Sequence, residues 1–300
     1  MQLTPQSFDT GNLELLAKQV VDGFIIGLHK SPFHGFSVEF AEHRLYNPGD
    51  NLRYIDWKVY GKSDKMFIKK FEEETNLKCC IALDTSASMH YPAEGMSKLY
   101  FSCLGAAAIM QLLKKQLDAT CLQFFTERTY WSSPVKSSER HYKMLLTEME
   151  KLLVAPPVTG QTDLPAVLHQ IAETMPQRAL VIIFSDFMED VRREQEFYNA
   201  LQHLKHQKNE VIIFHVGEGN KEWNFEFENR PYEFVDMETG DRLKLKAGEV
   251  KNLYVDKIKA YHKRLYEHCM KYNIDLVPCD TKESMNIILQ QYLSKRNKLM

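Results

Sequence analysis

The sequence predicts an α/β fold in which helices flank a doubly wound, mostly parallel sheet. From about residue 77 onward, short β-rich apolar runs alternate with stretches whose apolar residues recur at helical spacing. Such alternation is typical of a parallel sheet between two layers of helices. Several runs are almost uninterrupted in Val, Ile, Leu, Phe and Cys, as expected of strands that are covered on both faces.

The predicted sheet has five parallel strands and one edge strand. Residues 126–132 are expected to form a short antiparallel strand at the edge. The parallel strands are predicted at residues 77–83, 119–125, 179–184, 210–216 and 274–277. Helices are predicted where apolar residues recur at intervals of three and four, within residues 96–110, 142–149, 197–204 and 253–265.

Two further segments depart from this alternation. A β-hairpin insertion is expected near residues 231–247, because the turn-rich tetrad 238–241 separates two β-rich runs. The amino-terminal part begins with helical spacing over residues 13–28 and continues with a stretch rich in glycine, aromatic and charged residues. We therefore expect residues 1–76 to form an appended α+β segment and residues 77–300 to form the main domain.

The composition is that of a globular chain without a strong overall charge. Of its 300 residues, 44% are hydrophobic and 26% are charged, and the formal net charge is −2. A chain of this kind has no general attraction for nucleic acid or anionic lipid, and its apolar runs are far shorter than the roughly 20 residues that span a bilayer. With six cysteines and no Cys-x-x-Cys pair, we expect reduced thiols and a cytoplasmic location, with association at the periphery of a membrane complex left open.

Oxygen-bearing side chains directly follow two of the predicted strands. Asp84, Ser86 and Ser88 come after the strand at 77–83, and Asp186 comes after the strand at 179–184. Ligands of parallel α/β sheets bind at the carboxyl ends of strands, and Mg²⁺ prefers oxygen ligands. Because hydroxyls are weak ligands, the second carboxylate is needed. Thr162, in a loop that opens a helix, adds another hydroxyl.

The five residues Asp84, Ser86, Ser88, Thr162 and Asp186 resemble, in order and separation, the metal-ion-dependent adhesion site of von Willebrand factor A domains. The resemblance implies a bound Mg²⁺, Mn²⁺ or Ca²⁺ with one coordination position left for an Asp or Glu of a protein partner. Since the site has just two carboxylates, the sequence leaves open whether the metal is present.

A second resemblance covers the chain from about residue 30 onward. Residues 34–58, which include Asn47-Pro48-Gly49-Asp50, and the later residues 71–74 look like the signature of the bacterial family called domain of unknown function 58. Members of that family join such a segment to a von Willebrand A-like domain. The resemblance implies a partnership with MoxR-type AAA+ ATPases in membrane-linked or chaperone-like assembly.

Charged residues of both signs are concentrated in this signature. A paired and partly buried structural network is favoured, because the signs nearly balance and no nucleophile accompanies them. A docking surface or a catalytic cluster is the alternative. The residues concerned are Glu39, Glu42, Arg44, Asp50, Arg53, Asp56 and the neighbouring Trp57.

The site residues favour a binding protein over an enzyme. Phosphatases and phosphotransferases of α/β type need a nucleophilic Asp with an acid/base partner, whereas the position two residues after Asp84 is Ser86. Neither a Gly-x-Ser-x-Gly elbow nor a complete phosphate-cradling loop occurs. We expect a non-enzymatic, metal-dependent protein-interaction module. A Mg²⁺-dependent hydrolase or phosphotransferase, and a scaffold with an empty metal site, are the alternatives.

Overall fold

The computed structural model describes most of the chain, in two compact units. The larger unit contains Met1–Pro32 and Lys78–Met300, and the smaller one contains Phe33–Leu77. The residues whose structure is described are 13–25, 39–47, 55–63, 65–72, 77–157, 162–188 and 193–299.

A six-stranded sheet forms the centre of the larger unit, with the strand order β10-β7-β6-β3-β4-β5. All neighbouring strands are parallel except β5, which is antiparallel to β4. This arrangement confirms the predicted α/β fold class and the predicted edge strand. The strands are β3 (Lys78–Asp84), β4 (Ala119–Phe125), β5 (Thr129–Ser132), β6 (Leu180–Ser185), β7 (Glu210–Gly217) and β10 (Asp275–Asp280).

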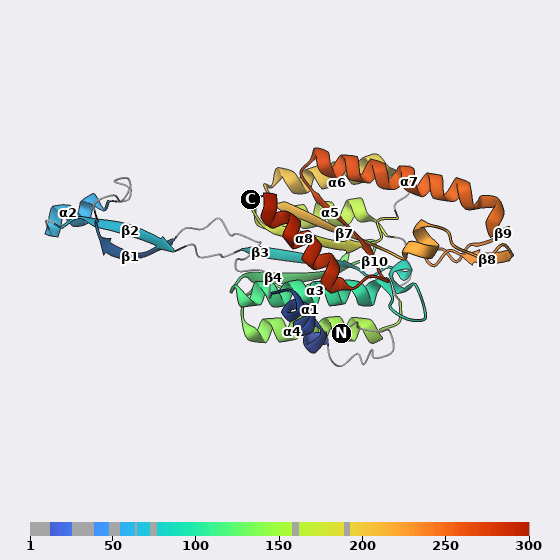
Figure 1. Cartoon of the computed structure of the whole chain (residues 1–300), viewed down its shortest axis with the longest axis horizontal. Coiled ribbons are helices and arrows are strands. Elements are labelled where there is room, and N and C mark those ends of the chain that lie inside the picture. Colours follow the sequence, from blue (N-terminus) through green and yellow to red (C-terminus); the bar gives the residue numbers. More distant parts are fainter. Residues whose placement is uncertain are drawn as a thin grey trace. The chain divides into compact units, whose positions relative to one another are not determined.

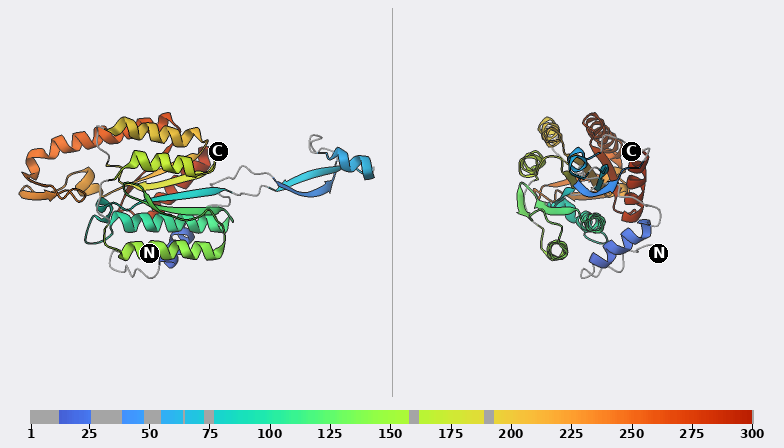
Figure 2. Two further views of the ribbon diagram at one scale, coloured as in Figure 1. Left: turned by 180° about the vertical axis from the view of Figure 1, so that it is seen from behind. Right: turned by 90° about the vertical axis from the view of Figure 1, so that its left-hand side faces the viewer.

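Helices cover both faces of this sheet, as Figure 1 and the end-on view in Figure 2 show. On one face, buried side chains of three helices pack on those of the strands in a single apolar core. These helices are α5 (Leu164–Thr174), α6 (Glu194–His206) and α7 (Ala247–Lys271). The other face is covered by α3 (Lys98–Lys115), α4 (Glu139–Val154) and α8 (Met285–Leu299).

Helix α3 is buried along almost its whole length. It contacts β3 and β4 on one side, and α1 (Leu13–Ile25), α4 and α8 on its other sides. A helix enclosed in this way is apolar all round rather than along one stripe. This enclosure also buries the lysine of its first turn, Lys98, which is 1% exposed.

Helix α1 belongs with the larger unit, so the structure divides the chain differently from the predicted segment 1–76. Leu13, Ala17, Val20 and Val21 are at most 2% exposed, and the helix lies against α3, α4 and α8. An apolar helix face of this kind must be covered, and the main domain covers it. The smaller unit therefore starts at Phe33.

The smaller unit is built on an antiparallel pair of strands. Strand β1 (Glu39–Leu45) pairs with β2 (Phe67–Glu72), and the short helix α2 (Trp57–Ser63) lies between them in the sequence. Ile55 bridges to Ile68 of β2, and both are less than 10% exposed.

The predicted hairpin insertion is present in the larger unit. Strands β8 (Pro231–Val235) and β9 (Arg242–Lys246) pair in antiparallel register, and β9 leads directly into α7. Within the larger unit, the hairpin lies at the end toward which β3 and the other parallel strands run (Figures 1 and 2). It is preceded by the one-turn π-helix η5 (Gly219–Trp223).

Candidate metal-binding site

The two predicted carboxylates lie at the point where the strand order reverses. Asp84 is the last residue of β3, and Asp186 follows Ser185, the last residue of the neighbouring strand β6. After β3 the chain continues to α3 on one face, and after β6 it continues to α6 on the other. In open α/β sheets this switch point leaves a crevice at the carboxyl edge, where ligands bind.

Asp84 is fully buried and accepts hydrogen bonds from Ser86 and Ser185. The backbone N–H of Ser86 donates to Asp84 Oδ1 at 2.9 Å, and the Ser185 hydroxyl donates to Asp84 Oδ2 at 2.6 Å. The first bond closes a tight turn that leads into a 3₁₀ turn at Ala87–His90. The turn places the hydroxyls of Ser86 and Ser88 3.0 Å apart.

Asp186 is joined to this loop and also to a buried lysine. It accepts a hydrogen bond from the side chain of Ser88, and its Oδ2 lies 2.8 Å from Nζ of Lys98. The same ammonium lies 2.6 Å from Glu222 Oε1 in η5. The other oxygen of Glu222 accepts from the backbone N–H of Glu218 at 2.7 Å. Neither Lys98 nor Glu222 was predicted from the sequence.

These contacts shift the pKa values of the three groups in different directions. Burial is the main cause that raises the pKa of Asp84 to about 7, and the nearby charge of Asp186 is the second. The hydrogen bonds from Ser185 and Ser86 lower this pKa, but by less. Burial also opposes the charge on Asp186, but the ammonium of Lys98 outweighs it, so the pKa of Asp186 is lowered. Burial would lower the pKa of Lys98, yet its two carboxylate partners raise it. Without a metal, therefore, Lys98 and Asp186 stay charged, whereas Asp84 takes up a proton near neutral pH.

Thr162, the fifth predicted ligand, is hydrogen-bonded to a residue that was not predicted. It lies just before α5, next to Asp163, whose side chain caps that helix by accepting from Ala166 N at 3.0 Å. The Thr162 hydroxyl donates to Glu238 Oε1 at 3.2 Å, and its backbone N–H donates to Glu238 Oε2 at 3.4 Å. Glu238 comes from the turn between β8 and β9. The structure thus brings Asp84, Ser86, Ser88 and Asp186 together through hydrogen bonds and links Thr162 to the hairpin.

The donor atoms fit a hard divalent cation. Neighbouring ligands of an octahedral ion at about 2.1 Å lie about 3.0 Å apart. The hydroxyls of Ser86 and Ser88, which are hydrogen-bonded to each other at 3.0 Å, have a separation compatible with that spacing. All the candidate donors are oxygens, as Mg²⁺ prefers. Within the described residues, no group of three or more His, Cys, Asp or Glu side chains is arranged to hold a metal. A metal at this edge therefore depends on the hydroxyls as well as the carboxylates.

A family model described as "Protein of unknown function DUF58" matches residues 42–263. The chain belongs to this family. The match includes part of the signature segment, the whole candidate site and the β8–β9 hairpin. The family description assigns no activity.

The curated relatives of this DUF58 chain bear the name of uncharacterized proteins. The "Uncharacterized protein Rv1480" of Mycobacterium tuberculosis and the "Uncharacterized protein Mb1516" of Mycobacterium bovis are each 27% identical over 177 residues. The aligned part is 59% of this chain and 55% of each relative. The chain thus spans about half the length of the curated relatives it matches.

Solved structures with a similar arrangement include the protein BatB and a von Willebrand A (VWA) domain. The conserved hypothetical protein BatB of Bacteroides thetaiotaomicron is 16% identical, with a TM-score of 0.45 over 74% of this chain and 99% of that one. The SpRpn10 VWA domain is 13% identical, with a TM-score of 0.38 over 72% of this chain and 94% of that one. At these TM-scores the assignment of the fold rests on the strand order and the family match.

The charged residues of the DUF58 signature are described in part. Asp56 accepts from the backbone N–H groups of Lys58 at 3.0 Å and Val59 at 3.2 Å, so it caps α2. Trp57 is 61% exposed and meets the ring of Tyr60 edge-on at 6.1 Å. Of the remaining predicted residues, Arg44 is exposed, Glu39 and Glu42 are strand positions in β1, and Asp50 and Arg53 lie outside the described residues.

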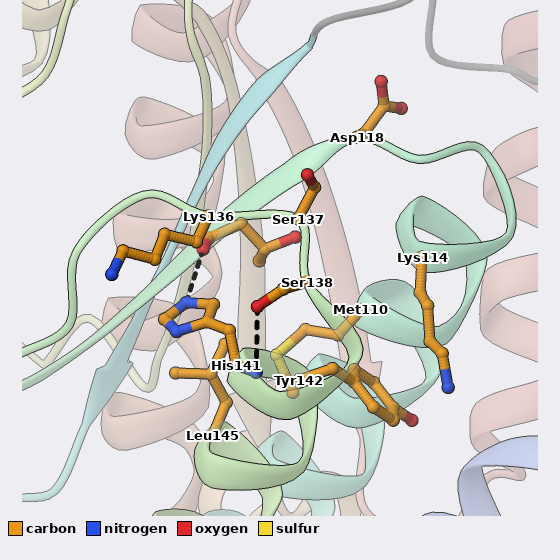
Figure 3. A pocket seen from close by; sticks show the side chains of 10 residues that line it. Met110, Lys114, Asp118, Lys136, Ser137, Ser138, His141, Tyr142 and Leu145 are labelled. Atoms are coloured by element: carbon orange, nitrogen blue, oxygen red, sulfur yellow. Dashed lines mark hydrogen bonds between the residues drawn. The ribbon is translucent and has the colours of Figure 1, made fainter.

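A pocket at the opposite edge of the sheet is unsuited to a ligand (Figure 3). It lies beside Thr120, near the start of β4, where His141 is hydrogen-bonded to the Thr120 carbonyl at 3.0 Å. Its volume of about 10 Å³ has room for roughly one water molecule. This pocket therefore has no room for a ligand larger than a water molecule.

Proposed function

We propose that this DUF58 chain is a non-enzymatic module that binds a protein partner through a divalent metal ion. The observation that carries the proposal is the convergence of Asp84, Ser86, Ser88 and Asp186 at the switch point, with two hydroxyls at the spacing of octahedral ligands. Mg²⁺ is the ion that the donors favour, with Mn²⁺ or Ca²⁺ as substitutes.

Each side chain has a distinct part in this proposal. Ser86 and Ser88 offer hydroxyl oxygens, and Asp186 offers carboxylate charge. Asp84, held by Ser86 N and the Ser185 hydroxyl, orients a ligand water or binds directly. The bound ion would supply an open coordination position for an Asp or Glu of the partner. Recognition of that kind needs no nucleophile and no acid/base pair.

A phosphotransferase is less well supported. Such an enzyme needs a lysine that is available to a phosphate, and the lysine at this site, Lys98, is buried between two carboxylates. Turnover of phosphate esters and ATP, measured with and without Mg²⁺, decides between the classes. We expect none. Mg²⁺-dependent turnover that disappears in an Asp84→Ala variant would replace the binding proposal by a hydrolase or phosphotransferase.

A scaffold with an empty metal site is the second candidate, because Lys98 already balances the charge of Asp186. Calorimetric titration with Mg²⁺ and Mn²⁺ tests it. We expect binding by the unmodified chain and by the exposed-serine control Ser137→Ala, and a loss of about tenfold or more in Ser86→Ala. If neither ion binds while a partner still does, the scaffold is the correct interpretation.

The partner that we propose is a MoxR-type AAA+ ATPase, on the strength of the family signature. The chain would then act in the assembly or maturation of membrane-linked complexes, from the cytoplasm or from the periphery of such a complex. No helix within the described residues is long and apolar enough to cross a membrane. Co-precipitation of purified chain and ATPase, in Mg²⁺ and in chelator, tests the pairing. We expect the complex to be lost in chelator and in Asp186→Ala.

A further inference from the structure

The smaller unit presents a tryptophan to solvent at the start of its helix. Trp57 is the first residue of α2 and is 61% exposed. Against the described part of the chain, α2 buries none of its residues. Exposed tryptophans are among the side chains that contribute most to protein interfaces. The packing of the smaller unit therefore gives Trp57 no role, and a role in binding has to be considered.

The backbone that carries Trp57 is fixed on strand β2. The N–H of Asp56 donates to the carbonyl of Phe67 at 2.9 Å, and the carbonyl of Asp56 accepts from the N–H of Tyr60 at 3.0 Å. The side chain of Asp56 caps α2, and the ring of Tyr60 meets Trp57 edge-on. An anchor whose backbone is already held loses less conformational entropy when a partner binds.

Two further apolar side chains are exposed at the same end of the smaller unit. Leu45, the last residue of β1, is 56% exposed, and Met66, directly before β2, is 40% exposed. The N–H of Tyr46 donates to the Met66 carbonyl at 2.9 Å, so the end of β1 lies beside the start of β2. Figure 1 shows α2 at this end. We call Leu45, Trp57 and Met66 the Trp57 end of the smaller unit.

The exposed charge beside Trp57 is positive. Lys58, Lys62 and Lys65 are all exposed, and no ion pair with another described residue reaches them. The described carboxylate of this segment, Asp56, is 9% exposed and is occupied by the helix cap. Asp64 lies outside the described residues. Apolar side chains with lysines around them are complementary to a surface that is apolar and acidic.

Two other occupants fit this end less well. In a symmetric contact with a second copy, the same patch meets itself, so lysines would face lysines. Residues 33–77 contain seven Lys or Arg and eight Asp or Glu, so the smaller unit as a whole has no positive charge to attract it to an anionic bilayer. A protein segment needs to cover only the Trp57 end.

We propose that the Trp57 end is a docking surface for an acidic, amphipathic segment of a partner protein. Trp57 is the anchor that the apolar side of the segment covers, and the lysines pair with carboxylates at its edge. This contact needs no metal ion, so it is independent of the function proposed for the switch point. It also gives Trp57, a residue of the DUF58 signature, a part in binding rather than in a buried network.

Binding of a labelled synthetic peptide to the full chain, measured by fluorescence anisotropy in chelator, tests the inference. The probe is a helical peptide with leucines along one side and glutamates elsewhere. We expect saturable binding that weakens about tenfold or more in Trp57→Ala. Leu117→Ala is the matched control, because it removes a 76% exposed apolar side chain of the larger unit. It should bind like the unmodified chain.

Charge variants give a second measurement. Lys62→Glu should weaken binding, and added salt should weaken binding by the unmodified chain. Lys257→Glu changes an exposed lysine of α7 and should have no effect. A probe with lysines in place of the glutamates should bind more weakly than the acidic one, and equal binding would overturn the acidic character of the partner.

The remaining outcomes also decide. Absence of binding by the unmodified chain, or equal affinities of Trp57→Ala and the unmodified chain, would overturn the inference. Vesicles of phosphatidylglycerol that bind through Trp57 when the peptide does not would assign the surface to lipid instead. Since Trp57 is exposed, Trp57→Ala should leave the urea midpoint of the chain unchanged. A lowered midpoint would show that the chain itself covers this side chain, and would likewise overturn the inference.

Discussion

Replacing Lys98 with methionine tests whether its buried ammonium neutralises carboxylate charge that the metal ion would otherwise neutralise. The Lys98 side chain is 1% exposed, and its Nζ lies 2.8 Å from Asp186 and 2.6 Å from Glu222. Methionine has a similar length and no charge. The substitution therefore leaves two carboxylates at the switch point without the cation that they share.

The expected magnitude follows from burial. Removing one partner of a buried ion pair costs about 3–5 kcal/mol of unfolding free energy, because the remaining charge is left behind in the interior. We expect a loss of this size in chelator. The substitution also removes a positive charge next to the proposed ion, and such repulsion amounts to several kcal/mol even at an effective dielectric constant of about 20. Mg²⁺ should therefore bind Lys98→Met at least about tenfold more tightly, a gain of about 1.4 kcal/mol.

Urea unfolding in chelator measures the loss of stability, and calorimetry measures the affinity for Mg²⁺. Lys114→Met is the matched control in the same helix. Lys114 is 25% exposed and pairs with the exposed Glu139 at 2.6 Å, so its loss should cost about 1 kcal/mol or less. If Lys98→Met is as stable as this control and binds Mg²⁺ no more tightly than the unmodified chain, the ammonium does not compete with the metal.

Three further predictions concern the site and the smaller unit. The pKa of Asp84 is about 7 in the folded chain against 3.8 as its ordinary value, so between these pH values the folded state holds a proton that the unfolded state has lost. In chelator, the unfolding free energy should therefore fall by roughly 3 kcal/mol as pH rises from 4 to 7, relative to Asp84→Asn. The affinity for Mg²⁺ should rise over the same range. Urea and calorimetric titrations check both, and flat profiles would contradict them. Ser185→Ala removes the hydroxyl that donates to Asp84 at 2.6 Å, and calorimetry should show Mg²⁺ affinity reduced about 10–100-fold. Asp56→Ala removes the cap of α2, which should cost about 1 kcal/mol of local stability, seen as faster hydrogen exchange in the first turn of that helix.

The strands and part of the site can be predicted because short apolar runs, and the polar residues directly after them, are visible in the sequence. Every residue of β6 (Leu180–Ser185) is buried, and five of its six residues are apolar, as a strand covered on both faces requires. Polar residues placed directly after such runs must lie at the carboxyl edge. For this reason Asp84 and Asp186 can be recognised as neighbours although about 100 residues separate them.

The remaining contacts of the site cannot be predicted from the neighbouring sequence. Lys98 occupies a helical turn in which a lysine is usually solvated, and its two partners are 88 and 124 residues away. Glu238 lies in a turn whose residues are otherwise exposed, so its inward direction depends on how the hairpin meets the loop of Thr162. The assignment of α1 is similar, because its spacing predicts a helix but does not tell which unit covers its apolar face. Pairings of this kind arise from tertiary packing.

The charges at the switch point also explain why metal and partner binding are expected to depend on each other. In the absence of metal, Lys98 balances Asp186 and Glu222, while Asp84 keeps a proton near neutral pH. A divalent ion must therefore displace a proton from Asp84 and share Asp186 with an ammonium, so its intrinsic affinity is reduced. An acidic partner that binds the metal-loaded form alone adds a favourable charge to the same place. By reciprocity, the partner raises the affinity for the metal by the same factor by which the metal raises the affinity for the partner. In a site of this composition, metal and partner are thus expected to strengthen each other's binding.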